Sequence, residues 1–256
     1  MIGQFKNFFS KDDNSIEGKL KKIQKLDSDL SVFGASSHCY KTNPPLSKKE
    51  IEDFEFQNGI QLPEEYKYYL GTIGNGGVGP FYGLYALENN DGNHPDLRKS
   101  FSYNRKMPLV MAEFYDQIPS DISEEEHERL LEEVYAKADS GIIFLATEGC
   151  GMYSVLVVNG EEYGNVWYYD LANDAGLYPL INPVTGTSLN FKEWYELWLN
   201  CSLEYFSKGK KNISKLFRFY CVGWKQNFYR FYYLLLFLGK IDTLTMHGCR
   251  KTPTSP

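Results

Sequence analysis

The sequence predicts an α+β protein in which helices accompany a mainly antiparallel sheet. Segments with helical periodicity and capping boxes fill the first third of the chain and two later stretches, and three short strand-like runs follow one another in between. The links between those runs are short, which favours antiparallel neighbours because a parallel pair needs a longer crossover. With 256 residues, 43% of them apolar, the chain is long enough to bury a core without disulfides.

Three helices are predicted before residue 75. Apolar residues recur at helical spacing over 16–26, opposite a lysine-rich face. A capping box at Ser47 begins the second helix, which stops near Asn58. Pro63 fits the first turn of the third helix, and Gly74 ends it.

The chain then changes to strand and loop patterns. The glycine-rich segment 74–80 breaks regular structure, and the aromatic and aliphatic run 81–87 predicts a strand. The polar stretch 88–107 predicts a long surface loop, and a short strand is expected over 109–111. A second capping box, at Ser123, begins a helix.

A meander and a closing helix complete the predicted domain. Asn190 caps the closing helix, in which Trp194 and Trp198 recur on one face. We interpret this aromatic face as part of the core rather than as a binding platform. The strand-like runs of the meander are 142–146, 153–158 and 166–171.

Charge is unevenly distributed along the chain. The total of 27 basic and 33 acidic residues gives a net charge of −6. Residues 1–207 contain 17 basic and 32 acidic residues, a net charge of −15, whereas 208–256 contain ten basic residues and a single acidic residue, Asp242. The acidic body repels nucleic acid and suits a basic partner. The 20 tyrosines and 17 phenylalanines supply contact area, which favours binding over chemistry.

The sequence also predicts a cytoplasmic protein. Its five cysteines are odd in number and lack the C-x-x-C spacing, as expected for reduced thiols. The N-terminus lacks the pattern of a secretory signal. The longest apolar stretch, 228–238, is about half the roughly 20 residues that a membrane span needs.

Patterns that suggest chemistry have simpler interpretations. The glycines of 74–79 match G-x-G-x-x-G, but a helix precedes them and a strand follows, which is the reverse of a phosphate-binding loop. Cys150 lies between two glycines, and the spacing implies no histidine base for it. The glutamates of 124–133 are interpreted as a solvated helix face. An enzyme that uses Cys150 or this acidic helix is a functional alternative that ranks third, after the two binding hypotheses given below.

Two short motifs stand at a distinctive spacing: L-P-x-x-Y at 62–66 and N-G-G at 75–77. A glycine-bearing hairpin at 164–170 and an aromatic helix at 190–199 follow them. In this order the chain closely resembles the SUKH superfamily over about 16–206. That superfamily includes bacterial immunity proteins, which neutralise toxins delivered by neighbouring cells, and the fungal cell-wall assembly regulator.

The resemblance implies helices packed on an antiparallel sheet, with no catalytic residue, no cofactor and no metal ion. It also implies that the motif residues serve packing, helix start and backbone freedom, not partner contact. These structural residues are Leu62, Pro63, Tyr66, Asn75, Gly76, Gly77, Trp194 and Trp198.

We divide the chain into a leader, 1–14, a SUKH-like domain, 15–207, and a basic aromatic extension, 208–256. The domain carries a loop-and-helix insertion at 88–141. The extension departs from the family pattern, and we expect it to be poorly ordered. Two interpretations of it stay open: a native element that docks on the acidic body, or a terminal extension without an evolved role.

The first functional hypothesis is a non-enzymatic immunity protein that binds and neutralises a cognate, basic protein toxin, nucleases being one class. The second is a regulatory or scaffolding module like the fungal relative. Neither hypothesis includes a nucleic-acid or membrane partner, and the oligomeric state stays open. Partner contacts are expected in exposed loops. The candidate contact residues are Tyr82, Asp91, His94, Asp96, Asp170 and Asp174.

Overall fold

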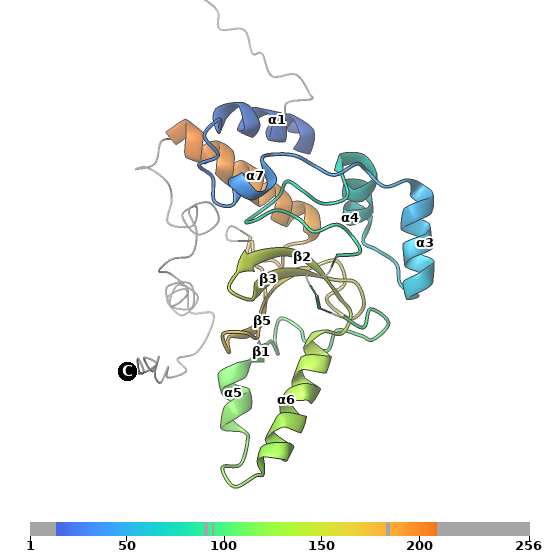
Figure 1. Cartoon of the computed structure of the whole chain (residues 1–256), viewed down its shortest axis with the longest axis vertical. Coiled ribbons are helices and arrows are strands. Elements are labelled where there is room, and N and C mark those ends of the chain that lie inside the picture. The colour runs from blue at the N-terminus through green and yellow to red at the C-terminus, as the bar shows by residue number, and fades with distance from the viewer. Residues whose placement is uncertain (1–13, 90–91, 94, 183–184, 209–256) are drawn as a thin grey trace, which may run out of the picture. The chain divides into compact units, whose positions relative to one another are not determined.

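A computed structural model describes residues 14–89, 92–93, 95–182 and 185–208 (Figure 1). All of them belong to the first of the two units into which the chain divides, Met1–Val222. Apart from Asn14 and Lys208, the predicted leader and the predicted basic extension lie outside the described residues.

The first two predicted helices form where the apolar periodicity of one and the capping box of the other place them. Helix α1 (Ile16–Leu26) begins after Ser15, whose side chain accepts a hydrogen bond from the backbone of the first turn. Helix α3 (Lys48–Asn58) begins with the predicted capping box, in which Ser47 and Glu50 bind each other's backbone N–H groups. Both predictions are confirmed, because each cap satisfies N–H groups that a helix start leaves without partners.

The third predicted helix is confirmed but is not uniform. It starts as α4 (Glu64–Tyr68), continues as one π-helical turn, η2 (Tyr69–Ile73), and ends at Gly74. A further one-turn helix, α2 (Ala35–His38), was not predicted, because it lies between residues in left-handed conformation and has no periodic pattern.

The predicted strand over 81–87 is wrong. Phe81 and Gly83 have positive φ angles of 55° and 99°, so the chain turns instead of extending. Leu84 alone forms isolated bridges, one to Gly77 and one to Ala146. The segment therefore lies along the edge of the sheet without joining it as a regular strand.

The sheet has five strands in the order β1-β5-β4-β3-β2, and every neighbouring pair is antiparallel. The predicted meander β2–β3–β4 is confirmed, and so is the short strand β1. Strand β5 was not predicted, because glycine and proline at its ends hide a four-residue pattern. The strands are β1 (Leu109–Val110), β2 (Ile142–Gly149), β3 (Met152–Val157), β4 (Val166–Asp170) and β5 (Gly176–Pro179).

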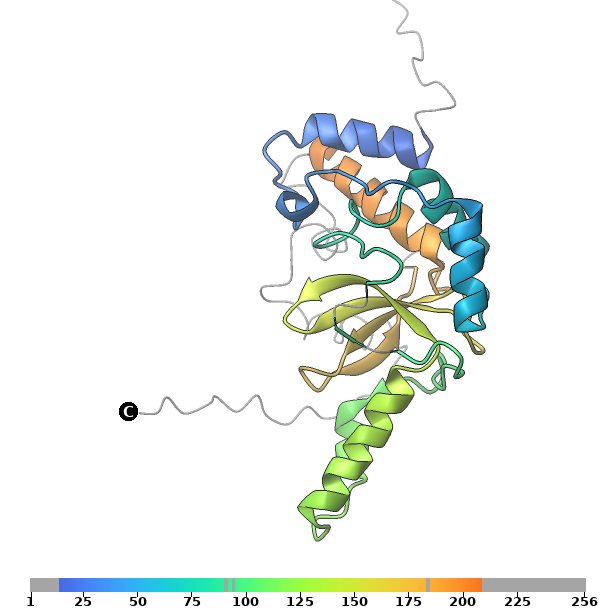
Figure 2. The same ribbon diagram turned by 45° about the vertical axis from the view of Figure 1, so that its right-hand side comes forward.

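Two helices between β1 and β2 form an arm, defined here as residues 111–139. Helix α6 (Glu124–Ala138) follows its predicted cap, Ser123, whereas α5 (Met111–Asp116) was not predicted. In Figures 1 and 2 the two helices lie side by side and extend away from the sheet. The predicted loop 88–107, which precedes the arm, contains no helix or strand among its described residues.

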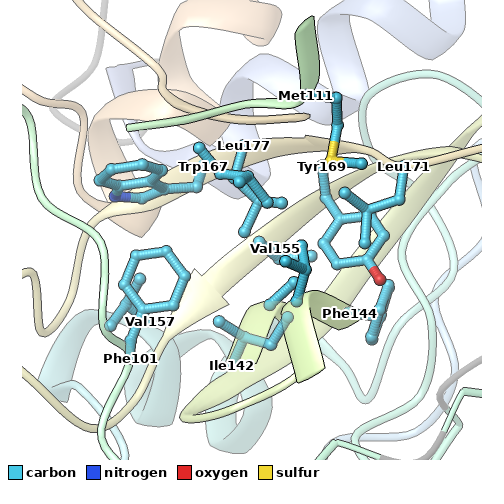
Figure 3. Close-up of a cluster of buried hydrophobic side chains, with 13 residues drawn as sticks. Phe101, Met111, Ile142, Phe144, Val155, Val157, Trp167, Tyr169, Leu171 and Leu177 are labelled. Atoms are coloured by element: carbon cyan, nitrogen blue, oxygen red, sulfur yellow. The ribbon is translucent and has the colours of Figure 1, made fainter. Parts of the chain in front are cut away.

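One face of the sheet and the base of the arm share a buried apolar cluster (Figure 3). Strand residues that alternate along β2, β3 and β4 point to this face, as the two-residue period of a strand requires. Val134 and Ala138 of α6 and Met111 of α5 pack into the cluster. The arm is therefore attached at its base, where apolar side chains meet the sheet.

The closing helix, α7 (Phe191–Lys208), also begins with a reciprocal cap. The backbone of Asn190 donates to the carboxylate of Glu193 at 3.1 Å, and the backbone of Glu193 donates to the Asn190 side chain at 2.9 Å. Trp194 and Trp198 are each only 1% exposed, so their predicted place in the core is confirmed. Among the described helices, including this longest one, none is sufficiently long and apolar to span a bilayer.

Aromatic side chains join α7 to the π-helical turn. The rings of Tyr69 and Tyr195 lie 5.1 Å apart between centroids. Both hydroxyls donate to the buried carbonyl oxygen of Val78, at 3.2 Å and 2.9 Å. These contacts fix the glycine-rich loop that follows η2, and with it the chain that leads to Tyr82.

Candidate functional site

Two turns of the meander lie at the same end of the sheet, because they join antiparallel strands. The β2–β3 turn consists of Cys150 and Gly151, and the β4–β5 turn spans 171–175. The side-chain amide of Asn173 donates to the carbonyl oxygen of Cys150 at 2.9 Å. A Cβ on Gly151 would overlap Ala172, so the two turns are in close contact. These contacts hold the two turns in a defined position relative to each other, and we call them the frame of this end of the sheet.

Tyr82 packs against this frame from the loop that follows the N-G-G motif. Its side chain is 41% exposed, and its ring lies 5.2 Å from that of Phe33 between centroids. Gly149 lies under the ring: a Cβ there would be 3.2 Å from Tyr82 Cε2. The tyrosine is thus supported on one side and open to a partner on the other.

Asp174 lies in the β4–β5 turn, where it has a positive φ of 57° and an exposed side chain. Its carboxylate accepts a hydrogen bond from the hydroxyl of Tyr115 on α5, at 2.8 Å. Burial, and next this hydrogen bond, raise the pKa of Tyr115 above its usual range, so the hydroxyl stays a donor. We give the name sheet-end surface to four of the exposed residues at this end: Tyr82, Ala172, Asn173 and Asp174.

Asp170 does not belong to that surface, and the expectation that it lies in an exposed loop is wrong. It is the last residue of β4 and is 2% exposed. Its carboxylate accepts hydrogen bonds from the Tyr168 hydroxyl at 3.0 Å and from the backbone and side chain of Asn173 at 3.0 and 2.8 Å. Asp170 therefore holds the β4–β5 turn in place from below.

A second buried carboxylate, Glu148, lies near Asp170 and was not predicted. It is 5% exposed, and the hydroxyl of Ser154 donates to it at 2.7 Å. Burial raises the pKa of Glu148 to about 8; the Ser154 hydrogen bond opposes this shift, and the charge of Asp170 adds to it. The only sequence signal was a lone glutamate at the end of an apolar strand pattern.

The remaining predicted contact residues do not join Tyr82 and Asp174. Asp96 is exposed, but it lies beside Ser140, at the start of β2, whereas Tyr82 lies at the end of that strand. Its carboxylate pairs with Lys99 at 3.3 Å. Asp91 and His94 lie outside the described residues.

Comparison with known protein families decides what the fold represents. A sequence model of the SMI1 / KNR4 family (SUKH-1) matches residues 45–197, which is more than half of the 256-residue chain. The chain belongs to the SUKH-1 family. This finding confirms the resemblance seen in the sequence. Together with the seven α-helices and the antiparallel sheet of the described residues, it also confirms the α+β, SUKH-like fold. A search of curated proteins and a search of solved structures each found no match.

Membership of the SUKH-1 family supports a role in immunity or in regulation through protein binding, in general terms. Proteins of this family are generally not catalysts. In the described part of the chain, no group of three or more histidine, cysteine, aspartate or glutamate side chains is arranged to hold a metal ion.

The SUKH motif residues are placed inside the molecule or in its turns. Leu62 and Tyr66 are 1% and 2% exposed. The side-chain oxygen of Asn75 accepts a hydrogen bond from the backbone N–H of Leu87 at 2.7 Å. Gly76 and its neighbour Gly77 have positive φ angles of 84° and 96°. Pro63 directly precedes α4 as its N-cap residue.

Cys150 is exposed at the tip of the β2–β3 turn and has a positive φ of 55°. Among the hydrogen bonds of the described residues, none involves its thiol, although its carbonyl oxygen binds Asn173. His38 is buried against Trp198, with ring centroids 6.2 Å apart, and His127 stacks on Tyr115 in the arm. Each of these histidines is therefore engaged by an aromatic neighbour.

Proposed function

We propose that this SUKH-1 protein is a non-enzymatic immunity protein that acts in the cytoplasm by binding a basic protein toxin and blocking it. The observation that carries the proposal is the family match over 45–197 on a body, 1–207, with a net charge of −15. A toxin that cleaves nucleic acid needs a cationic face, and an acidic antidote that covers this face is attracted to it over long range.

The sheet-end surface supports this proposal as a contact site. Tyrosine is among the residues that contribute most to protein interfaces, since it offers apolar area and a polar tip with little loss of side-chain freedom. Tyr82 meets that description, and Asp174 adds a carboxylate on a turn fixed by hydrogen bonds. A preorganised surface loses less entropy on binding than a mobile one.

The test is co-expression of the full chain with the toxin encoded beside its gene. The proposal predicts that the wild-type protein restores growth and binds the toxin in a pull-down. Tyr82→Ala combined with Asp174→Ala should weaken toxin binding by about tenfold or more. Tyr68→Ala is the matched control, since Tyr68 is an exposed tyrosine (56%) on α4 and should leave binding unchanged.

Two outcomes would contradict the proposal. If the wild-type chain binds the toxin but cells are not rescued, neutralisation is wrong. If it binds no toxin and instead retains endogenous proteins through the sheet-end surface, the chain is a regulatory or scaffolding module, the second role that SUKH-1 membership supports.

A further inference from the structure

A groove lies in the arm between α5 and the start of α6. Figures 1 and 2 show the turn that joins these two helices at the far end of the arm. Its volume is about 520 Å³. Apolar walls come from Ile118, Pro119 and Ile122, and the rings of Tyr115 and His127 stack at 6.5 Å with an interplanar angle of 13°. The side chains of Ser120, Ser123 and Glu124 also line it, so the groove offers apolar surface, a ring pair and a polar rim to a side chain from outside.

The part of α6 beside this groove has little to pack against. The helix buries only Val134 and Ala138, both near its C-terminal end, and no residue of 124–133 is buried. Leu130 and Leu131 are only partly buried, and of the two Leu131 packs against the apolar cluster of the sheet. Helices in proteins gain most of their stability by packing an apolar face, so the N-terminal part of α6 receives less support than its base.

Carboxylates run along this less supported part of α6. Glu124, Glu128 and Glu132 stand four residues apart, so they share one face of the helix, and all three are exposed. Among the described residues none of the three forms an ion pair, and the helix's arginine, Arg129, is already paired with two other glutamates. Like charges at this spacing repel and destabilise a helix.

The stripe meets the groove, because Glu124 lines it. Over the whole arm, 111–139, ten acidic residues stand against two basic ones. An apolar side chain that enters the groove is therefore met by negative charge on its flank. Charge complementarity selects a cationic segment and disfavours nucleic acid or an acidic peptide.

We propose that the arm is a docking surface for a lysine- or arginine-rich protein segment, which places an apolar side chain in the groove and its cations along the Glu124, Glu128 and Glu132 stripe. Cations there replace like-charge repulsion by attraction, and the inserted side chain adds packing to the N-terminal part of α6. The proposal rests on the proposed function for the class of partner, a basic protein. It assigns that partner a second contact surface, beyond the sheet-end surface.

The first test uses a synthetic peptide of lysine and leucine that carries a dansyl group, added to the full chain. Glu124→Gln, Glu128→Gln and Glu132→Gln together should weaken its binding by about tenfold at low salt, and by less as salt is raised. The control variant carries the same change at three exposed glutamates elsewhere and should bind within about twofold of wild type. These glutamates are Glu65, Glu88 and Glu161.

The groove is tested separately from the charge. Ile118→Ala combined with Ile122→Ala should abolish the blue shift of the dansyl fluorescence, while thermal unfolding shows whether the fold is retained. Equal peptide affinity for the stripe variant and its control would overturn the proposal. So would carbodiimide cross-links that join the arm of free protein to lysines of 208–256, since the occupant would then be the chain's own basic segment.

The toxin itself separates this proposal from the function. If wild type binds and neutralises the toxin while the stripe variant does so with equal affinity, the docking surface is wrong and the proposed function stands. If no toxin is bound but the peptide requires the stripe and the groove, the docking surface stands and the proposed function is wrong.

Discussion

The buried carboxylate of Glu148 makes protein stability depend on pH in a way that one substitution should remove. The side chain is 5% exposed, and burial raises its pKa from 4.5 to about 8. In the unfolded chain the same group ionises near its ordinary value. Between these two pH values the folded state keeps a proton that the unfolded state has lost.

The sign of the effect follows from this difference. A raised folded-state pKa means that the stability present below pH 4.5 is lost as pH rises towards 8. Each unit of pKa difference corresponds to about 1.4 kcal/mol, so between pH 5 and pH 8 the loss from this group amounts to about 3 to 4 kcal/mol. Glu148→Gln keeps the shape and still accepts the Ser154 hydrogen bond, but it does not titrate.

The assay is urea unfolding of the wild type and of Glu148→Gln at several pH values from 5 to 8. The stability of the variant relative to wild type should increase with pH by about 3 to 4 kcal/mol across this range. Glu88→Gln, at an exposed glutamate, is the control and should change the difference by less than about 0.5 kcal/mol. A difference between Glu148→Gln and wild type that stays constant with pH would refute the reasoning.

Three further outcomes are expected. Tyr69→Phe and Tyr195→Phe should each lower the free energy of unfolding by about 1 kcal/mol. The double variant should lower it by more than their sum, because the buried carbonyl oxygen of Val78 then loses both donors. A double-mutant cycle in urea measures this difference. Gly76→Ala should lower the free energy of unfolding by about 2–4 kcal/mol, since its Cβ would lie 2.6 Å from a backbone oxygen. Gly92→Ala, with open space around it, should lower the free energy of unfolding by about 1 kcal/mol. Similar losses in the two variants would contradict this reasoning. Burial alone would raise the pKa of Asp27, but hydrogen bonds from two side chains and two backbone N–H groups hold it below 3.8. Asp27→Asn should therefore destabilise the fold by about 2–3 kcal/mol at pH 7, and the loss should shrink as pH falls below 4.

Local signals in the sequence predicted those elements whose ends are fixed by nearby residues. Ser47, Ser123 and Asn190 each bind the backbone of their own helix start, so the information lies within four residues. The run 81–87 has the composition of a strand, yet the chain turns at Phe81 and Gly83. The carbonyl group of Phe81 lies directly against Gly34, far away in the sequence. The conformation of this run depends on the chain that surrounds it, and the local pattern does not record that.

The candidate site was only partly predictable for the same reason. Tyr82 and Asp174 were expected to be exposed, and they are, but their common location depends on the pairing of β2, β3 and β4. Asp170 has the composition of a turn residue, and its burial follows from the register in which Asp170 pairs with Gly176. Glu148 acquires its raised pKa only when the folded sheet buries it away from water and, to a lesser extent, brings the charge of Asp170 close.

The turn of Gly149, Cys150 and Gly151 has three consecutive positive φ angles and touches both Tyr82 and Ala172. A side chain at either glycine would come too close to Tyr82 or Ala172. The side chain of Cys150, between them, is exposed. Natural or engineered diversification at position 150 therefore alters the chemistry presented beside Tyr82 while the backbone frame stays constant. A substitution at this position is thus a way to change what this end of the sheet presents to a partner protein without changing the fold.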